Sequence, residues 1–350
     1  MAASVTCLCG AVALTVELDP AEDPTQLQLC HCHDCRVVTG LLFSSYYLLQ
    51  HEPPALETLQ KYQESPHVSR FFCRTCGAHV FAQTQPNGRF LVASGILIDK
   101  DTPPVRSIQH WKVSDTIDGG LAVFLPEWPS KDTSCRLQTS PHRSVINPAP
   151  QDLEQNRNIV HAGCHCGGVQ FDITPPDASS AQAFSQWCDV LVPFNGDFPD
   201  KDNHADVKWW LREGHTKFFA ATCACVSCRL GSGFPIQVWA FIPKSNLFNR
   251  DRSPLTFGSG TMKVYNSSPG VYREFCARCG ATIFWHNDGR PTLIDVSVGL
   301  IRGPGARALA LLDWGLDRVS FAETAVQIDL VDWLETGMRQ FSGRQTSRDT

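Results

Sequence analysis

Residues 30–36 read CHCHDCR, and residues 223–229 repeat much of this stretch as CACVSCR. Each stretch is preceded by a Cys-x-Cys pair and followed by a Cys-x-x-Cys pair. These pairs lie at residues 7–9 and 73–76 in the first half, and at residues 164–166 and 276–279 in the second. The same motifs in the same order predict two tandem copies of one cysteine-rich domain.

The composition is that of a globular protein that uses cysteine to bind metal. The 350 residues suffice for two domains, and a net charge of -5 gives no general attraction to nucleic acid. We find neither a secretory signal nor a membrane-spanning stretch, so we expect a cytoplasmic protein, with the nucleus as the alternative. In a reducing compartment, 16 cysteines favour metal sites over disulfides. Only Cys135 and Cys188 lie outside the clusters.

Short apolar and β-branched runs separated by turn residues predict an all-β fold. We expect the first domain at residues 1–128 and the second at residues 159–338. The proline-rich polar residues 129–158 between them are typical of a linker, and residues 339–350 of a polar tail. Apolar spacing also predicts a helix over residues 325–341.

The second copy is longer because of an insertion at about residues 173–220. Within it, residues 206–213 are expected to form a short helix that carries Trp209 and Trp210. These indoles either pack the insertion onto the domain core or form a wall of a substrate pocket.

The seven clustered cysteines of each domain divide most simply into a set of four and a set of three. Residues i and i+2 of an extended segment share a face, so a Cys-x-Cys pair can point at one ion. Joined to the Cys-x-x-Cys pair, it would make a closed structural zinc site. The four-cysteine sets are Cys7, Cys9, Cys73 and Cys76, and Cys164, Cys166, Cys276 and Cys279. The spacing also permits a Cys-x-Cys pair to join the central cluster, and iron–sulfur binding is the alternative to zinc.

The three-cysteine sets are Cys30, Cys32 and Cys35, and Cys223, Cys225 and Cys228. In the first set we expect a turn over His33 and Asp34 to bring the third cysteine back to the others, with His31 on the opposite side. His33 or Asp34 could cap this set, but Val226 and Ser227 stand at those places in the second. A shared design therefore leaves the fourth position to a thiol or water, the alternative being a capped structural site.

Three thiolates make zinc a poor Lewis acid for splitting water, which disfavours a zinc hydrolase. The same ligands suit a fourth sulfur, because a substrate thiol bound there would lose its proton near neutral pH. The three-cysteine sets therefore favour the making or breaking of carbon–sulfur bonds as the catalytic function.

The order C-x-C-G, C-H-C-x-x-C-R and F-C-x-x-C-G, followed by a glycine-containing strand and a His-Trp stretch, resembles the glutathione-dependent formaldehyde-activating enzyme family, also named for centromere protein V. The resemblance covers nearly all of both halves except the linker, the insertion and the tail. It implies a β-tent fold, a structural zinc on each four-cysteine set and a more labile zinc on each three-cysteine set. It also implies a lyase that adds glutathione to formaldehyde. The tandem copy departs from the family pattern, as do Ala224 for the usual histidine and Asp313 opposite His110.

Glutathione carries two carboxylates, which arginine recognises through paired hydrogen bonds. Four arginines stand at corresponding places near the clusters of the two copies: Arg36, Arg70, Arg229 and Arg273. They either bind this co-substrate or serve in salt bridges and packing. We therefore expect an enzyme that joins a small-molecule thiol to an aldehyde or a bulkier electrophile. The alternative is a non-catalytic zinc-binding scaffold or binding module.

Overall fold

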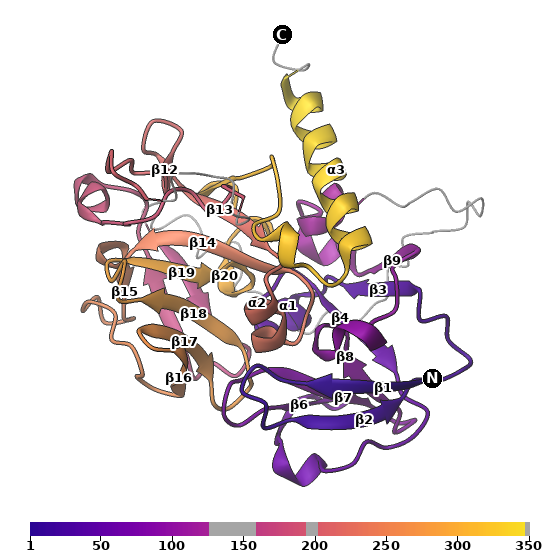
Figure 1. Cartoon of the computed structure of the whole chain (residues 1–350). Coiled ribbons are helices and arrows are strands. Elements are labelled where there is room, and N and C mark those ends of the chain that lie inside the picture. The colour runs from indigo at the N-terminus through magenta and orange to yellow at the C-terminus, as the bar shows by residue number, and fades with distance from the viewer. Residues whose placement is uncertain (126–158, 194–201, 347–350) are drawn as a thin grey trace.

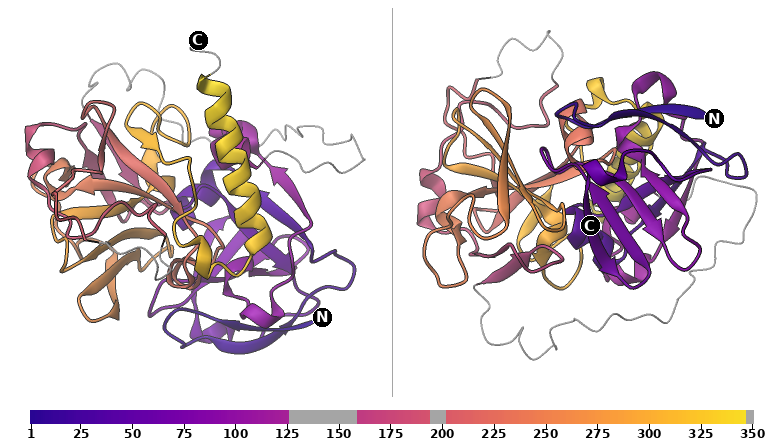
Figure 2. Two further views of the ribbon diagram at one scale, coloured as in Figure 1. Left: turned by 45° about the horizontal axis from the view of Figure 1, so that its top comes forward. Right: turned by 90° about the horizontal axis from the view of Figure 1, so that it is seen from below.

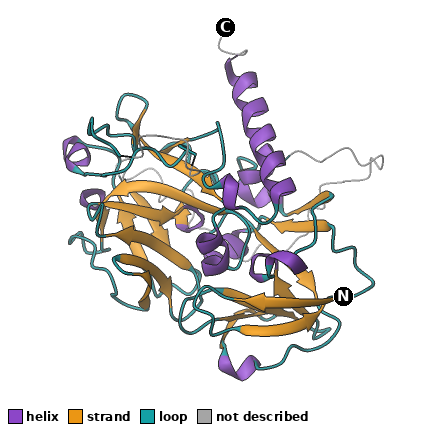
Figure 3. Ribbon diagram, viewed as in Figure 1, coloured by secondary structure: helices purple, strands orange, loops and turns teal. Residues whose placement is uncertain are grey.

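The computed structural model describes residues 1–125, 159–193 and 202–346, which form two β-rich domains (Figures 1 and 3). The all-β, two-domain architecture is confirmed, whereas the predicted linker at 129–158 lies outside the described residues. Helices α1 and α2 lie between the two main sheets (Figure 1). Among the described residues, no helix is both long enough and apolar enough to cross a membrane.

The first domain consists of a hairpin and a seven-stranded sheet. The hairpin pairs β1 (Ala2–Thr6) with β2 (Ala13–Glu17). The sheet has the order β5-β6-β7-β8-β4-β3-β9, in which β3 and β9 are parallel. Its strands are β3 (Gln26–Cys30), β4 (Ser44–Leu48), β5 (Gln60–Ser65), β6 (Val68–Phe72), β7 (His79–Thr84), β8 (Phe90–Ala93) and β9 (Ser107–Trp111).

The second domain repeats this topology with additions. Its main sheet has the order β12-β13-β14-β19-β18-β17-β16, and β21 pairs with β13 in parallel. A smaller sheet has the order β15-β11-β10-β20. The strands are β10 (Val160–Gly163), β11 (Gln170–Ile173), β12 (Leu211–Arg212), β13 (Lys217–Cys223), β14 (Gln237–Pro243), β15 (Leu247–Phe248), β16 (Met262–Ser268), β17 (Val271–Cys276), β18 (Thr282–Asn287), β19 (Leu293–Ser297), β20 (Ile301–Arg302) and β21 (Leu312–Trp314).

Three α-helices and several 3-10 helices complete the described chain. The α-helices are α1 (His33–Thr39), α2 (Val226–Ser232) and α3 (Ile328–Thr346). The 3-10 helices are η1 (Leu56–Thr58), η2 (Ser94–Ile96), η3 (Asp99–Asp101), η4 (Val113–Thr116), η5 (Gly120–Phe124), η7 (Ala178–Gln182), η8 (Lys244–Asn246), η9 (Val298–Leu300) and η10 (Ala322–Thr324). Helix α3 was predicted, but it runs further than residue 341 and takes in much of the predicted polar tail.

The prediction of a short helix at residues 206–213 is wrong. This segment forms turns and β12, and the helical part of the insertion is the 3-10 helix η7 instead. Trp210 is fully buried and donates its indole N–H to the Ser180 carbonyl oxygen at 3.1 Å. Trp209 packs edge-on against Phe241, with ring centroids 5.0 Å apart. Both indoles therefore attach the insertion to the domain core rather than line a pocket.

The two domains meet through matching backbone contacts around a pseudo-twofold arrangement. The amide of Gly299 in η9 donates to the Gly40 carbonyl oxygen at 2.9 Å, and the amide of Gly95 in η2 donates to that of Gly233 at the same distance. Gly40 and Gly233 end α1 and α2 with φ of 83° and 93°, which glycine adopts without strain. Each helix thus ends against the other domain.

The C-terminal helix holds the domains together from one side. Although α3 follows the second domain in sequence, it packs on η5 of the first (Figure 2), where the Phe341 and Phe124 rings lie 5.2 Å apart. Just before α3, the Gln327 side-chain amide donates to the Tyr47 hydroxyl at 3.2 Å. The C-terminal residues of the second half therefore add to the interface between the domains.

Candidate metal centres

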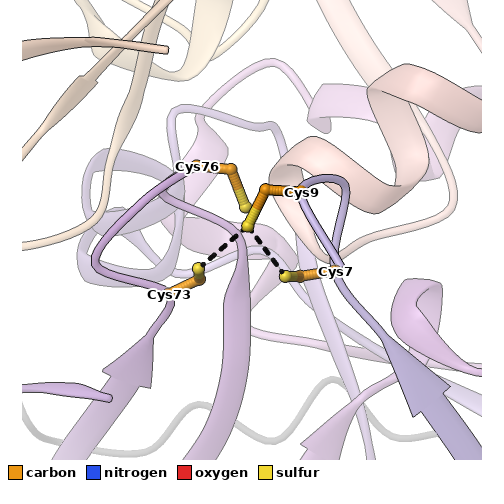
Figure 4. Close-up of side chains that lie close together, drawn as sticks. All are labelled: Cys7, Cys9, Cys73 and Cys76. Atoms are coloured by element: carbon orange, nitrogen blue, oxygen red, sulfur yellow. Dashed lines mark hydrogen bonds between the residues drawn. The ribbon is translucent and has the colours of Figure 1, made fainter. Parts of the chain in front are cut away.

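The structure brings each predicted four-cysteine set together. The eight sulfurs form two groups, Cys7, Cys9, Cys73 and Cys76 (Figure 4) and Cys164, Cys166, Cys276 and Cys279, with ligand atoms within 4.8 Å of one another. The arrangement in which a Cys-x-Cys pair joins the central cluster is therefore ruled out. Cys188 stays outside the clusters, as predicted, and Cys135 lies outside the described residues.

Two tight turns present the sulfurs of the first set. Cys7 and Cys9 follow β1 in the turn to β2, and Cys73 and Cys76 lie in the hairpin between β6 and β7. Backbone amides donate to the sulfurs, such as Val12 N to Cys7 Sγ at 3.4 Å. Such donors favour the ionised thiolate, which is the form that binds metal.

The sulfur spacing fits a tetrahedral zinc ion. Four ligands at about 2.3 Å from zinc have sulfurs about 3.8 Å apart. The measured separations are 3.4 Å for Cys7–Cys9 and 3.5 Å for Cys9–Cys73. In the second domain they are 3.6 Å for Cys164–Cys166 and 3.5 Å for Cys166–Cys276. Both sets can hold zinc with little rearrangement.

Each three-cysteine set is built at a strand end and a helix start. Cys30 ends β3, Cys32 caps the N-terminus of α1, and the Cys35 amide donates to Cys32 Sγ at 3.3 Å. The second set repeats this on β13 and α2, with the Cys228 amide 3.3 Å from Cys225 Sγ. Hydrogen bonds from the other two thiols, and the nearby Arg70 charge, hold the pKa of Cys35 well below its usual range. In both sets the sulfurs lie within 4.8 Å of one another.

No fourth protein ligand joins either set of three among the described residues. His33 accepts a hydrogen bond at its Nε2 from Arg302 Nη1 at 2.9 Å, and Asp34 Oδ1 lies 3.8 Å from His165 Nε2. His33 and Asp34 are thus turned toward the second domain rather than toward the cysteines. His31 points to the opposite side, as predicted, and its Nε2 is 2.9 Å from His110 Nδ1. In the described structure, neither His33 nor Asp34 therefore joins the first set as a fourth ligand.

The four predicted arginines divide into two pairs. Arg70 donates from Nη2 to Cys35 Sγ at 3.2 Å, and the guanidinium of Arg273 lies 3.9 Å from Cys228 Sγ. Arg36 instead donates to the carbonyl oxygens of His31 and Asp115, at 2.6 and 3.3 Å. Arg229 donates to the Gly95 and Leu97 carbonyl oxygens at 2.7 and 2.8 Å and pairs with Asp99 at 2.9 Å. Only Arg70 and Arg273 reach the clusters, whereas the other pair contributes to packing.

The sequence profile of the glutathione-dependent formaldehyde-activating enzyme family matches residues 2–112 and 207–310, which together span more than half of the chain. The chain belongs to this family. A solved structure of a Rhodobacter sphaeroides protein is similar at 19% identity and a TM-score of 0.25, over 44% of this chain and 99% of that chain. No curated protein matches the chain.

The second family match begins after Cys164 and Cys166, yet the structure joins both to Cys276 and Cys279. The insertion therefore separates the first cysteine pair of the second copy from the matched region without removing it from the cluster. Each copy therefore has all seven clustered cysteines, four in one group and three in the other.

The predicted placement of Asp313 opposite His110 is wrong in register. Trp111 lies beside Cys30 in the β3–β9 ladder, but Ser320 lies beside Cys223 in the second domain. The backbone confirms this, because His31 N donates to Trp111 O at 2.9 Å and Ala224 N donates to Ser320 O at 3.0 Å. Extra residues after β21 shift the register, so the sequence alignment placed Asp313 opposite His110 although the fold does not.

Several polar residues near the first three-cysteine set escaped the sequence analysis. Glu64 forms a buried ion pair with Arg70 Nε, and the Tyr46 hydroxyl accepts from Arg70 Nη1 at 2.7 Å. His165 and Arg302 reach this set from the second domain. Except for His165, which stands inside a Cys-x-Cys pair, these residues belong to no motif, so the sequence carried no local signal for their contacts.

Proposed function

We propose that this chain is a zinc-dependent enzyme of the carbon–sulfur lyase type that forms or breaks adducts between glutathione and an aldehyde. One observation carries the proposal: each three-cysteine set gathers three sulfurs within 4.8 Å, and no further ligand from the described residues joins them. Membership of the glutathione-dependent formaldehyde-activating enzyme family supports the same thiol substrate.

The cysteines Cys30, Cys32 and Cys35, and their counterparts Cys223, Cys225 and Cys228, would hold the zinc. Zinc held by three thiolates supplies a soft fourth position at which a substrate thiol loses its proton near neutral pH. In the forward reaction the substrate sulfur bonds to the carbonyl carbon, the carbonyl π bond breaks, and the oxygen takes up a proton. The thiol and the aldehyde thus combine into a hydroxyalkyl thioether without any oxidant.

Arg70 supports this chemistry by holding the first set in place. Each of its three guanidinium nitrogens already donates, to Glu64, Tyr46 and Cys35. Its positive charge next to Cys35 favours the thiolate that binds metal. We assign Arg273 the same role beside Cys228, since it is the equivalent residue of the second copy.

A direct test follows adduct formation from glutathione and formaldehyde by proton NMR. We expect the zinc-loaded chain to raise the rate above the spontaneous reaction, and the Cys32→Ala, Cys225→Ala double variant to lose this effect. Elemental analysis should give four zinc ions per chain, of which two exchange under a thiol chase. A rate equal to the spontaneous one, with four ions that do not exchange, would support the non-catalytic zinc scaffold instead.

A further inference from the structure

Each domain presents one loop to the three-cysteine helix of the other domain. The His165 amide donates to the Val37 carbonyl oxygen on α1 at 3.1 Å, and the Leu8 amide donates to that of Leu230 on α2 at 3.2 Å. These matched bonds make His165 and Leu8 structurally equivalent. The middle residue of each Cys-x-Cys pair therefore lies next to the other domain's three-cysteine helix.

The second domain places two polar side chains against the first three-cysteine set. His165 Nδ1 is 2.7 Å from the Tyr62 hydroxyl, and its Nε2 faces Asp34 at 3.8 Å. Arg302 at the end of β20 donates from Nη1 to His33 Nε2 at 2.9 Å. Both contacts are made to side chains at the start of α1, the helix that carries Cys35 and is capped by Cys32, on the side that faces the second domain.

The second three-cysteine set lacks this polar surrounding. Leu8 stands where His165 would be, and α2 offers Val226 and Ser227 in place of His33 and Asp34. The ladders make Ile98 the counterpart of Arg302, because Leu97 bridges Val5 as Ile301 pairs with Ala162. Tyr46 and Glu64 likewise have Trp239 and Ser267 as their counterparts. The polar groups supplied by the other domain thus lie at the first set, whereas the second set has Gln237, Arg273 and Glu274 of its own domain beside Cys228.

Arg302 forms no ion pair within 4.0 Å in the described part of the chain, although Cys164 and Asp34 favour its charged form from a greater distance. Its hydrogen bonds in the described part of the chain go to His33 and to the Gly163 carbonyl oxygen at 2.9 Å. Burial lowers the pKa of Arg302 to about 10, so the side chain remains a cation at neutral pH. A half-buried guanidinium bonded to neutral acceptors favours an incoming carboxylate, which it can bind through two N–H groups.

We propose that the first three-cysteine set is the thiol-binding site of the chain and that the second domain completes it: Arg302 binds a carboxylate of the thiol substrate, and His165 positions Asp34 and Tyr62. This inference rests on the proposed function, because it assumes that a thiol occupies the fourth position. It assigns the second domain a supporting role at a site that neither domain forms alone.

Calorimetric titration of the full-length, zinc-loaded chain tests the proposal. We expect one glutathione per chain. Arg302→Gln should weaken glutathione binding about ten- to a hundredfold, as expected for the loss of a charged hydrogen bond. The same variant should leave the affinity for 2-mercaptoethanol unchanged, because that thiol has no carboxylate. His165→Leu, which introduces the residue found at Leu8, should weaken glutathione binding while zinc content holds.

Two control variants separate this effect from general destabilisation. Ile98→Ala changes the equivalent position of the first domain, and Arg339→Gln removes the same charge from the exposed face of α3. Both should bind glutathione like the unmodified chain. Two equivalent glutathione sites per chain, or an unchanged glutathione affinity of Arg302→Gln, would overturn the inference while leaving the proposed function intact. Binding of neither thiol by the unmodified chain would overturn both.

Discussion

Substitution of Gly299 by alanine should separate the two domains locally and so test whether the interface supports thiol binding. A Cβ atom at this position would lie 2.2 Å from the Leu41 carbonyl oxygen and 2.5 Å from the Gly40 carbonyl carbon. Both atoms belong to the backbone, so no side-chain rotation relieves the clash. The shift would also break the hydrogen bond from the Gly299 amide to Gly40.

The expected loss of stability follows from these two contributions. Overpacking in a well-packed region costs about 1 to 3 kcal/mol, and the hydrogen bond contributes about 1 kcal/mol. We therefore expect Gly299→Ala to lower the free energy of unfolding by about 2 to 4 kcal/mol. Because β20 follows η9 directly, we also expect weaker glutathione binding through displacement of Arg302.

Urea unfolding followed by tryptophan fluorescence measures the stability, and calorimetry measures glutathione affinity. Gly303→Ala is the matched control, because a Cβ atom there meets no heavy atom within 4 Å. The control should stay close to the unmodified chain in both assays. Equal unfolding free energies for the two variants would refute the interface geometry.

Four further changes test other parts of the structure. In α3, Gly337→Ala places a Cβ atom 1.8 Å from a backbone carbonyl oxygen of η5 and should destabilise the docked helix, which limited proteolysis would detect. Gly343→Ala in the same helix meets nothing within 4 Å and should stabilise it by about 1 kcal/mol; a loss of stability there would contradict the reasoning. Cys76→Ser should remove one zinc ion per chain by elemental analysis and lower the unfolding temperature, whereas retention of four ions would disprove the four-cysteine assignment. Glu64→Gln leaves Arg70 buried without its carboxylate and should cost about 3 kcal/mol in urea unfolding, since both side chains are at most 6% exposed.

The grouping of the cysteines could be predicted from the sequence because thiolate chemistry restricts the choices. The two sulfurs of a Cys-x-Cys pair can bind one ion, and so can those of a Cys-x-x-Cys pair. Combining the two pairs into one site leaves three cysteines of each domain for a second site. Helices α1 and α2 escaped prediction because seven residues are too few to show a 3.6-residue period. The sequence signals for the ends of these helices were the glycines Gly40 and Gly233. Each of them follows the last helical residue and has a positive φ.

The surroundings of the sites could not be predicted, because they depend on contacts between segments far apart in the chain. Arg302 meets His33 across 269 positions, and His165 meets Tyr62 across 103. The alignment of the two copies also placed Asp313 wrongly opposite His110, because extra residues in the second copy shift the strand register. Local patterns therefore identified the cysteine groups, whereas the contacts that distinguish the two three-cysteine sets needed the packed domains.

The interface explains how two copies of one domain can keep the same metal ligands and still differ in function. Its backbone contacts are matched, and glycine is required on both sides, at Gly95 and Gly299, because any side chain would strike the opposite backbone. Side chains around these contacts are not constrained in this way, so Leu8 and His165 differ although their backbones make the same hydrogen bond. Polar side chains of the second domain, such as His165 and Arg302, can then reach the first domain while the backbone contacts stay symmetric. A tandem chain permits this asymmetry, which a dimer of identical subunits could not encode.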